Sequence, residues 1–403
     1  MGRGSQALID TGFRLFGAGR IFRPRHIRQL ALTGVDAETM TPVLKTIRSL
    51  NEWSGKWTFH GDDHLKTALA CQTPSRRAEH FKSAAAMFYM AGLFHLPGHP
   101  LRPQLTEKMV SAYQAFGRES RMFHPVVFQS DGFRVHGNLY HPAPHEQRPV
   151  VIMIPPLGSV KEQIHFLVAP FYDAGSACLT LDLPGVGETQ GSMPLDTHRI
   201  ISDVITQLLE FRNIEPHTLA MLGLSLGAYW TMKTAAVDER VRMAIGISTP
   251  AVSGKHWERL PAHYWGYFQE VFKTQTLEET KRIATQLCLY GVMDRITCPV
   301  LLIHGKRDRV SQPDAMSLFL EHTRRAPLST RTYDKCAHCC LDELERQVLP
   351  SCLTWYTEQL NMVSRQRPPL TARPGNLSLI PSGASPSPSG HPSPASPDSP
   401  TFA

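Results

Sequence analysis

Gly223-Leu224-Ser225-Leu226-Gly227 follows the apolar run from Leu219 to Leu222 and precedes a helical pattern from Ala228 to Val237. A strand, a tight turn centred on a serine and a helix, in this order, form a nucleophile elbow. The two glycines leave room for neighbouring backbone, and the turn holds the serine Oγ above a parallel sheet. The pentapeptide therefore predicts that Ser225 is a nucleophile at the end of a buried strand.

Strand and helix patterns alternate on both sides of this elbow. Continuous apolar runs of this length are typical of strands that helices cover on both faces. We expect strands at Val150 to Ile154, Ala177 to Asp182, Ala244 to Ile247, Val300 to Ile303 and Ser329 to Tyr333, helices at Gln163 to Ala174 and Asp196 to Phe211, and a hairpin from Val126-Val127-Phe128 to Phe133–Tyr140 around Asp131-Gly132. The order predicts an α/β protein with a doubly wound, mostly parallel sheet.

The remaining chain divides into three further segments. Residues 1–120 show helical periodicity at Leu30 to Leu50, Arg77 to Ala91 and Pro103 to Phe116, which predicts an N-terminal helical cap region. A catalytic domain at 121–362 would end in a helix from Leu341 to about Leu360 and contain an aromatic-rich insertion at about 250–294. The Pro/Ser-rich tail at 363–403 has too few apolar residues to offset its ordering entropy, so we predict disorder.

A serine hydroxyl needs a histidine to take its proton and a carboxylate to orient that histidine. In this fold the acid follows a late strand and the histidine follows the last strand. Asp308 and His338 stand in those positions and complete a predicted triad with Ser225. The alternative for Ser225 is an ordinary turn serine beside two packing glycines.

Other acids and histidines are weaker candidates for the triad. Asp294 precedes its strand, and Asp334 is close enough to His338 in sequence to stabilise the local turn instead. His304 comes before the acid and breaks the order that the fold requires.

Attack on a carbonyl creates an oxyanion that needs two hydrogen-bond donors. The backbone N–H of Leu226, directly after the nucleophile, would supply one. The second would come from the loop Pro155-Pro156-Leu157-Gly158-Ser159, where the prolines lack N–H groups and leave Leu157 or Gly158. The alternative is that this loop is only a rigid turn.

Aromatic side chains crowd the insertion. Trp257, His263, Tyr264 and Trp265 are candidate substrate-binding residues for a flat substrate, and the alternative is that they pack as the core of a lid.

Composition narrows the function classes. The chain has 403 residues, 42% of them hydrophobic, and a net charge of +7. It shows no recognised nucleic-acid motif and no apolar run near the roughly 20 residues that span a membrane. Neither nucleic acid nor membrane is expected as a partner, and a cytoplasmic location is the default because the N-terminus lacks a secretory pattern.

The eight cysteines are scattered, so reduced thiols are expected. Cys336-Ala337-His338-Cys339-Cys340 lacks further ligands at zinc spacing, so no metal is predicted.

Three stretches together resemble one branch of the α/β-hydrolases: Leu157-Gly158-Ser159-Val160-Lys161-Glu162, Asp182-Leu183-Pro184-Gly185-Val186-Gly187-Glu188 and the elbow, with the helical N-terminal region. This branch contains the fermentation-respiration switch protein, dihydroxypseudooxynicotine hydrolase and fungal pigment polyketide-shortening hydrolases. The resemblance implies Ser-Asp-His catalysis under a helical cap. It also implies that some members cleave a carbon–carbon bond beside a ketone.

The leading hypothesis is a serine hydrolase without a cofactor that cleaves a carbon–carbon, ester or thioester bond in a polyketide-like metabolite. A general carboxylesterase and a catalytically idle binding or regulatory protein are the alternatives. The expected partner is a small-molecule substrate, with a homodimer left open.

Overall fold

The computed structural model describes residues 3–250, 257–258, 260–311 and 315–365. Its helices are α1 (Arg3–Phe16), α2 (Ala18–Ile21), α3 (Pro24–Ala31), α4 (Ala37–Thr46), α5 (Leu50–Ala70), α6 (Pro74–Gly92), α7 (Leu101–Ser120), α8 (His165–Asp173), α9 (Thr197–Leu208), α10 (Leu226–Ala235), α11 (Ala262–Phe272), α12 (Leu277–Ala284), α13 (Ala315–His322) and α14 (Leu349–Arg365). Its strands are β1 (Phe123–Ser130), β2 (Phe133–Tyr140), β3 (Val150–Ile154), β4 (Ala177–Leu181), β5 (Ala220–Leu224), β6 (Met243–Ile247), β7 (Val300–Gly305) and β8 (Leu328–Tyr333).

The eight strands form one sheet in the order β1-β2-β4-β3-β5-β6-β7-β8. β2 is antiparallel to both of its neighbours, and β3 to β8 pair in parallel. Asp131 and Gly132 form the two-residue hairpin loop with φ of 45° and 81°, which is a turn that twists with the strands. The sequence-based prediction of a doubly wound, mostly parallel sheet is confirmed.

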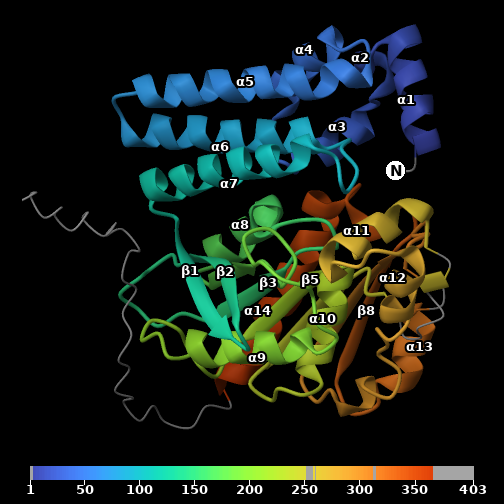
Figure 1. The fold of residues 1–403 in the computed structure, drawn as a ribbon. Helices are drawn as coiled ribbons and strands as arrows, with labels where there is room; N and C mark the ends of the chain where they lie inside the picture. Colours follow the sequence, from blue (N-terminus) through green and yellow to red (C-terminus); the bar gives the residue numbers. More distant parts are fainter. Residues whose placement is uncertain (1–2, 251–256, 259, 312–314, 366–403) are drawn as a thin grey trace, which may run out of the picture.

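Helices cover both faces of this sheet (Figure 1). One apolar cluster lies between the sheet and α9 and α10, and a second lies between the opposite face and α8 and α14. All five residues of each of β3, β4, β5 and β6 are buried, because side chains on both faces of these strands contact helices.

The N-terminal helices form a layer above this body (Figure 1). The long helices α5, α6 and α7 pack side by side, and α6 and α7 also contribute Phe81, Ala85, Met109 and Tyr113 to the sheet-facing cluster. A third cluster around Phe13, Trp53 and Trp57 lies within the layer. We call α1 to α7 the cap; it is joined to the body by shared apolar packing as well as by the chain.

The structure corrects several predicted helix boundaries. The helix expected from Leu30 to Leu50 is interrupted, since α3 ends at Ala31 and α4 ends at Thr46. The long helix α5 was missed because its buried positions include Ser54 and Gly61, which an apolar pattern does not register. The final helix was expected from Leu341, but α14 begins at Leu349, after a 3-10 turn and a π-helical turn (Leu344–Val348).

α14 also runs to Arg365, three residues into the predicted tail, and the rest of that tail lies outside the described residues.

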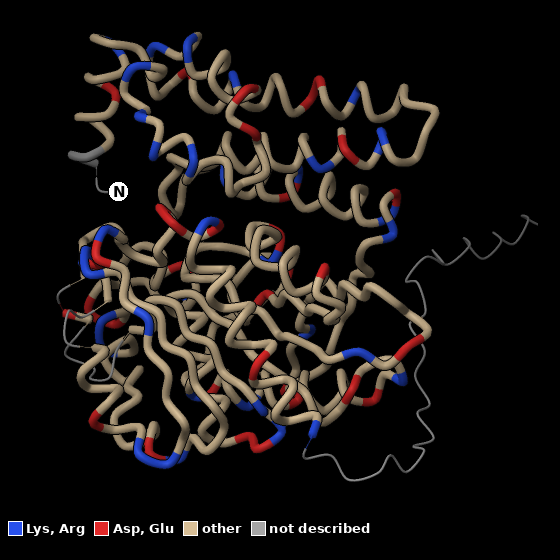
Figure 2. Tube along the Cα trace, turned by 180° about the vertical axis from the view of Figure 1, so that it is seen from behind, with Lys and Arg blue, Asp and Glu red and all other residues tan. Residues whose placement is uncertain are grey.

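Charged residues do not gather on one side of the molecule. Figure 2 shows Lys and Arg positions interspersed with Asp and Glu over both the cap and the body. Within the described residues, no helix combines the length and apolar character that crossing a bilayer requires.

Candidate active site

The nucleophile elbow lies between β5 and α10. Ser225 occupies a strained conformation with φ of 51° and ψ of −118°, which a non-glycine residue adopts only when its surroundings enforce it. Gly227 packs so closely on the end of β3 that an added Cβ would lie 2.3 Å from the carbonyl oxygen of Ile154. The side chain of Ser225 is therefore held at the carboxyl edge of the sheet, and the residue is 7% exposed.

Ser225, His338 and Asp308 form one hydrogen-bonded chain. The Oγ of Ser225 lies 2.9 Å from Nε2 of His338, and Nδ1 of His338 lies 2.9 Å from Oδ2 of Asp308. The three residues are separated by up to 113 positions in sequence. They come together because the loops after β5, β7 and β8 meet at the same edge of the parallel sheet.

Asp308 is held in its ionised form. Its Oδ1 accepts hydrogen bonds from the backbone N–H groups of Val310 and Ser311, at 2.8 and 3.0 Å. Burial by itself would raise the pKa of Asp308, but hydrogen bonds from His338 and from these N–H groups outweigh burial and lower its pKa to about 2. The carboxylate can therefore orient His338 throughout the neutral range.

His338 has a raised pKa. Burial by itself lowers the pKa of the ring, but neighbouring Cys339 and the hydrogen bond to Asp308 outweigh burial.

Ser248 helps to hold the loops of the triad in position. Its Oγ accepts the backbone N–H of Cys339, and its carbonyl accepts the hydroxyl of Ser311. Ser248 thereby ties the acid loop to the histidine loop, a role that sequence reasoning missed because nothing near it in sequence indicates the contact.

The rejected candidates lie elsewhere. Asp334 forms an exposed ion pair with Lys306 at 2.7 Å, and Asp294 lies in a 3-10 turn before β7. His304 is buried within β7, and burial lowers its pKa. In the described residues, the hydrogen bond to Ser225 comes from His338 and not from His304.

The loop after β3 lies against the elbow. Pro156, Leu157, Gly158 and Ser159 form a tight turn in which Ser159 N–H donates to Pro156 O, and Gly158 takes φ of 81°. Leu157 and Leu226 line the same small cavity of about 10 Å³. Leu226 is the first residue of α10, where backbone N–H groups have no intrahelical partner.

Like the N–H of Leu226, the N–H groups of Leu157 and Gly158 donate to no acceptor within the described part of the chain. The predicted donors are therefore near one another, and the choice between Leu157 and Gly158 stays open.

A buried ion cluster holds the loop after β3 in position. Nζ of Lys161 lies 2.7 Å from Glu162 Oε1, 2.9 Å from Asp182 Oδ2 and 2.6 Å from Glu188 Oε2. The Lys161 side chain is 1% exposed, and the charges of the three carboxylates outweigh burial and raise its pKa. Burial raises the pKa of Glu162 to about 7. Two of the three stretches on which the sequence resemblance rests, the one from Leu157 to Glu162 and the one from Asp182 to Glu188, thus meet at Lys161.

A cavity of about 290 Å³ lies between the cap and this loop, and we call it the outer chamber. Its walls include Tyr89, His95, Arg102, Met109, Leu157, Gly158, Gln163, His263, Tyr264 and Tyr267. Two of the four aromatic-insertion candidates, His263 and Tyr264, line it. Trp257 and Trp265 do not, because both are buried in the body, where Trp257 Nε1 donates to Leu287 O and Trp265 packs on Phe268.

The cap residues of the outer chamber were missed by sequence reasoning. Tyr89 and Arg102 belong to α6 and α7, and they reach the site only because the cap folds over the loop after β3. No group of three or more potential metal ligands occurs among the residues that the structure describes.

Comparisons with known proteins place the chain among hydrolases and esterases. A family model described as esterase FrsA-like matches residues 36–315. The chain is 32% identical over 176 residues to 2,6-dihydropseudooxynicotine hydrolase from Paenarthrobacter nicotinovorans, an alignment that covers 42% of this chain and 46% of that protein. It is 27% identical over 184 residues to hydrolase LUC6 from a Fusarium species, covering 41% and 44%. The chain spans about half the length of the curated relatives it matches.

Solved structures extend the likeness to most of the chain. The crystal structure of 2,6-dihydroxy-pseudo-oxynicotine hydrolase has a TM-score of 0.76 at 23% identity and covers 83% of this chain and 95% of that one. AbyA5 has a TM-score of 0.66 at 19% identity, covering 84% and 98%. At these identities the likeness shows the fold, which is that of an α/β-hydrolase with an N-terminal helical region.

Proposed function

The chain belongs to the FrsA-like esterase family, and from that premise we propose that it is a serine hydrolase that works through an acyl-enzyme. The observation that carries the proposal is the hydrogen-bonded chain from Ser225 through His338 to Asp308, with 2.9 Å at each step. A binding protein has no need of a strained serine in contact with an oriented histidine.

In the first half-reaction, neutral His338 takes the hydroxyl proton of Ser225 as Oγ attacks the substrate carbonyl carbon. The oxyanion is stabilised by the N–H of Leu226 and by the N–H of Leu157 or Gly158. Collapse of this intermediate breaks the bond to the leaving group, which takes the proton from His338. The products are the first fragment and an ester of Ser225.

In the second half-reaction, His338 takes a proton from water as the water oxygen attacks the acyl-enzyme. The intermediate then collapses, His338 returns that proton to Oγ of Ser225, and a carboxylic acid leaves. Ester and thioester cleavage differ from carbon–carbon cleavage only in the first leaving group. An alkoxide or thiolate is protonated on oxygen or sulfur, whereas a bond beside a ketone breaks to an enolate that is finally protonated on carbon.

We propose a polyketide-like or aryl ketone substrate, cleaved at a carbon–carbon, ester or thioester bond. The outer chamber supports this choice, because Tyr89, Tyr264 and Tyr267 offer ring surfaces next to the loop after β3. One similar protein is named for hydrolysis of 2,6-dihydropseudooxynicotine, a small organic molecule. A general carboxylesterase is the alternative within the same chemistry.

Labelling by a fluorophosphonate tests whether the protein is an enzyme. We expect the folded protein to be labelled at Ser225, and the Ser225→Ala variant and the heat-unfolded protein to remain unlabelled. Circular dichroism checks that the variant is folded. Absence of label on the folded protein would favour an idle binding or regulatory protein instead.

A matched panel of aryl esters and aryl 1,3-diketones tests the reaction type. Cleavage of both classes, with both activities lost in Ser225→Ala, is the expected result. Cleavage of the esters alone would indicate a carboxylesterase and would contradict the proposal that the protein cleaves carbon–carbon bonds.

A further inference from the structure

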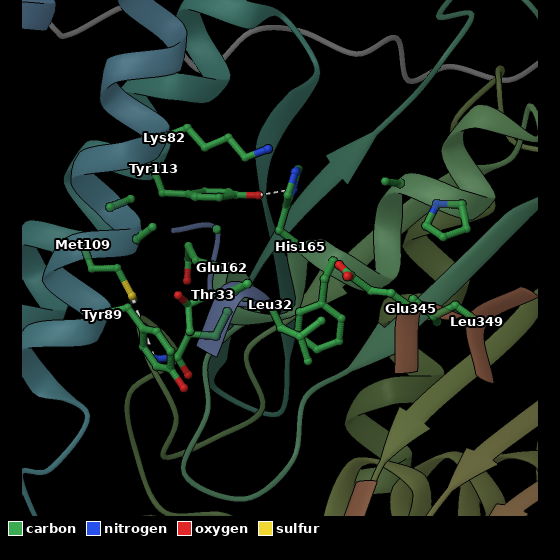
Figure 3. A pocket seen from close by; sticks show the side chains of 18 of the residues that line it. Leu32, Thr33, Lys82, Tyr89, Met109, Tyr113, Glu162, His165, Glu345 and Leu349 are labelled. Atoms are coloured by element: carbon green, nitrogen blue, oxygen red, sulfur yellow. Dashed lines mark hydrogen bonds between the residues drawn. The ribbon is translucent and has the colours of Figure 1, made fainter. Parts of the chain in front are cut away.

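A second cavity of about 510 Å³ also lies between the cap and the body, and we call it the inner chamber (Figure 3). This volume is within the range of small-molecule sites. Most of its wall is apolar and comes from the residue that follows α3 and from α6, α7, α8 and α14, through Leu32, Ala85, Ala86, Met109, Phe166, Leu349 and Leu353. It shares Tyr89, Met109 and Gln163 with the outer chamber, so the two chambers are neighbours between the cap and the body.

One end of the inner chamber carries a cation, Lys82, for which the described residues supply no counter-ion. The half-buried side chain of Lys82 forms no ion pair or hydrogen bond with any described residue, and its ammonium lies 5.7 Å from the ring centroid of Phe116. Burial lowers the pKa of Lys82. In Figure 3 its nitrogen extends over the Tyr113 ring toward His165. An ammonium in an apolar wall is poorly solvated and favours an anionic partner.

His165 presents a second donor at the same end. The hydroxyl of Tyr140 is fully buried and lies 2.6 Å from that of Tyr113, which lies 2.7 Å from Nδ1 of His165. A buried hydroxyl needs an acceptor, so Tyr140 donates to Tyr113 and Tyr113 donates to His165. Burial and the charge of Lys82 lower the pKa of His165 to about 3, which leaves the ring neutral with its proton on Nε2.

The carboxylates of the inner chamber do not neutralise Lys82. Glu162 is paired with Lys161 at 2.7 Å, and Figure 3 shows it on the other side of the Tyr113 ring. Glu345 belongs to the π-helical turn before α14 and is exposed. The end formed by Lys82 and His165 therefore offers one charged and one neutral donor in apolar surroundings.

We propose that the inner chamber binds the carboxylate of an apolar, ring-sized molecule, with Lys82 as its counter-ion and His165 Nε2 as a second donor. Because the two chambers share walls, and resting on the proposed hydrolase function, we assign this carboxylate to the far end of the substrate that Ser225 attacks. A separate small acid, distinct from the substrate, would bind Lys82 and His165 in the same way. The second experiment distinguishes a carboxylate on the substrate from a carboxylate on such a separate acid.

The first experiment measures binding by calorimetry to the full-length Ser225→Ala protein, using 2-naphthylacetate and its uncharged analogue 2-naphthylacetamide. The acid is expected to bind more tightly than the amide. Lys82→Met should lower the affinity for the acid about tenfold and leave the affinity for the amide unchanged. Lys82→Arg should keep the affinity for the acid, because the positive charge remains. Lys108→Met, a cap lysine paired with Asp62 outside the chamber, is the matched control and should change neither affinity.

Equal affinity for acid and amide, or an undiminished affinity for the acid in Lys82→Met, would overturn the proposal. Because this experiment uses Ser225→Ala, its result stands whether or not Ser225 reacts with a fluorophosphonate.

The second experiment uses the unsubstituted protein and an uncharged aryl ester. Competitive inhibition by 2-naphthylacetate would support a carboxylate on the substrate itself, and non-competitive inhibition would support a separate acid. Inhibition of either kind should weaken about tenfold in Lys82→Met. Inhibition that is equal in both proteins would place the acid elsewhere and contradict the site.

Discussion

The Nζ of Lys161 lies 2.9 Å from Oδ2 of Asp182, and the backbone N–H of Lys161 donates to Oδ1 of the same carboxylate at 2.8 Å. Asp182 also accepts the backbone N–H of Glu188 at 3.1 Å. These contacts join the loop after β3, which holds the proposed oxyanion donors, to the turn after β4. The cation is buried among three carboxylates, so its removal would leave like charges together in a low-dielectric site.

We therefore expect Lys161→Met to lower the free energy of unfolding by about 3–5 kcal/mol, the usual cost of breaking a buried ion pair. Urea denaturation followed by circular dichroism measures it. Lys306→Met is the control, because the pair between Lys306 and Asp334 is exposed and its loss should change the free energy of unfolding far less than the loss of Lys161. Similar losses in both variants would show that the buried cluster has no special role in stability.

Asp308→Asn should lower kcat/KM by about 10⁴-fold while leaving the fold intact. An amide in place of the carboxylate can no longer stabilise the imidazolium or fix the tautomer of His338. Initial rates with a p-nitrophenyl ester measure the effect. Asp334→Asn is the matched control and should keep its activity, since Asp334 is exposed and paired with Lys306.

The pH dependence of kcat/KM should be shifted to alkaline values. His338 must be neutral to accept the proton of Ser225, so activity falls as the pH decreases through its pKa. Because that pKa is raised above the ordinary 6.5, the acidic limb should lie above pH 6.5. Cys339→Ser should move the limb to lower pH, because Cys339 is the first group that raises this pKa. An unchanged limb in Cys339→Ser would contradict this origin of the shift.

Gly158→Ala should reduce kcat/KM by about 10²-fold, a typical cost for displacing a catalytic group by about 1 Å. An added Cβ would lie 2.5 Å from Cδ1 of Tyr267 and push the loop away from the elbow. Gly132→Ala is the control: Gly132 has the same φ of 81°, but an added Cβ meets no atom within 4 Å. It should cost about 1–2 kcal/mol of stability without loss of activity.

The double variant Gly158→Ala/Tyr267→Ala tests the cause directly. Activity should recover in part relative to Gly158→Ala, because the ring that the methyl group strikes is gone. No recovery would mean that backbone strain at Gly158, and not the clash, moves the loop.

Sequence alone predicted the sheet and the relative positions of Ser225, Asp308 and His338 within it. Buried strands leave continuous apolar runs, and an elbow needs glycine beside its serine, so both features are recorded locally. In a parallel sheet the loops after successive strands meet at one edge. The order of motifs along the chain therefore indicates which side chains come together.

The tertiary structure alone determined the two chambers, the buried position of Lys161 and the roles of the aromatic insertion. Trp257 and Tyr264 belong to the same aromatic-rich segment, yet one is buried in the body and the other lines the outer chamber. The sequence around Lys82 indicates only an amphipathic helix, and its position at the inner chamber depends on which distant surfaces that helix contacts. The periodicity of apolar residues indicates whether a side chain is buried, but it does not indicate which other residues cover that side chain. For the two chambers, those residues are brought together by the contact between the cap and the body.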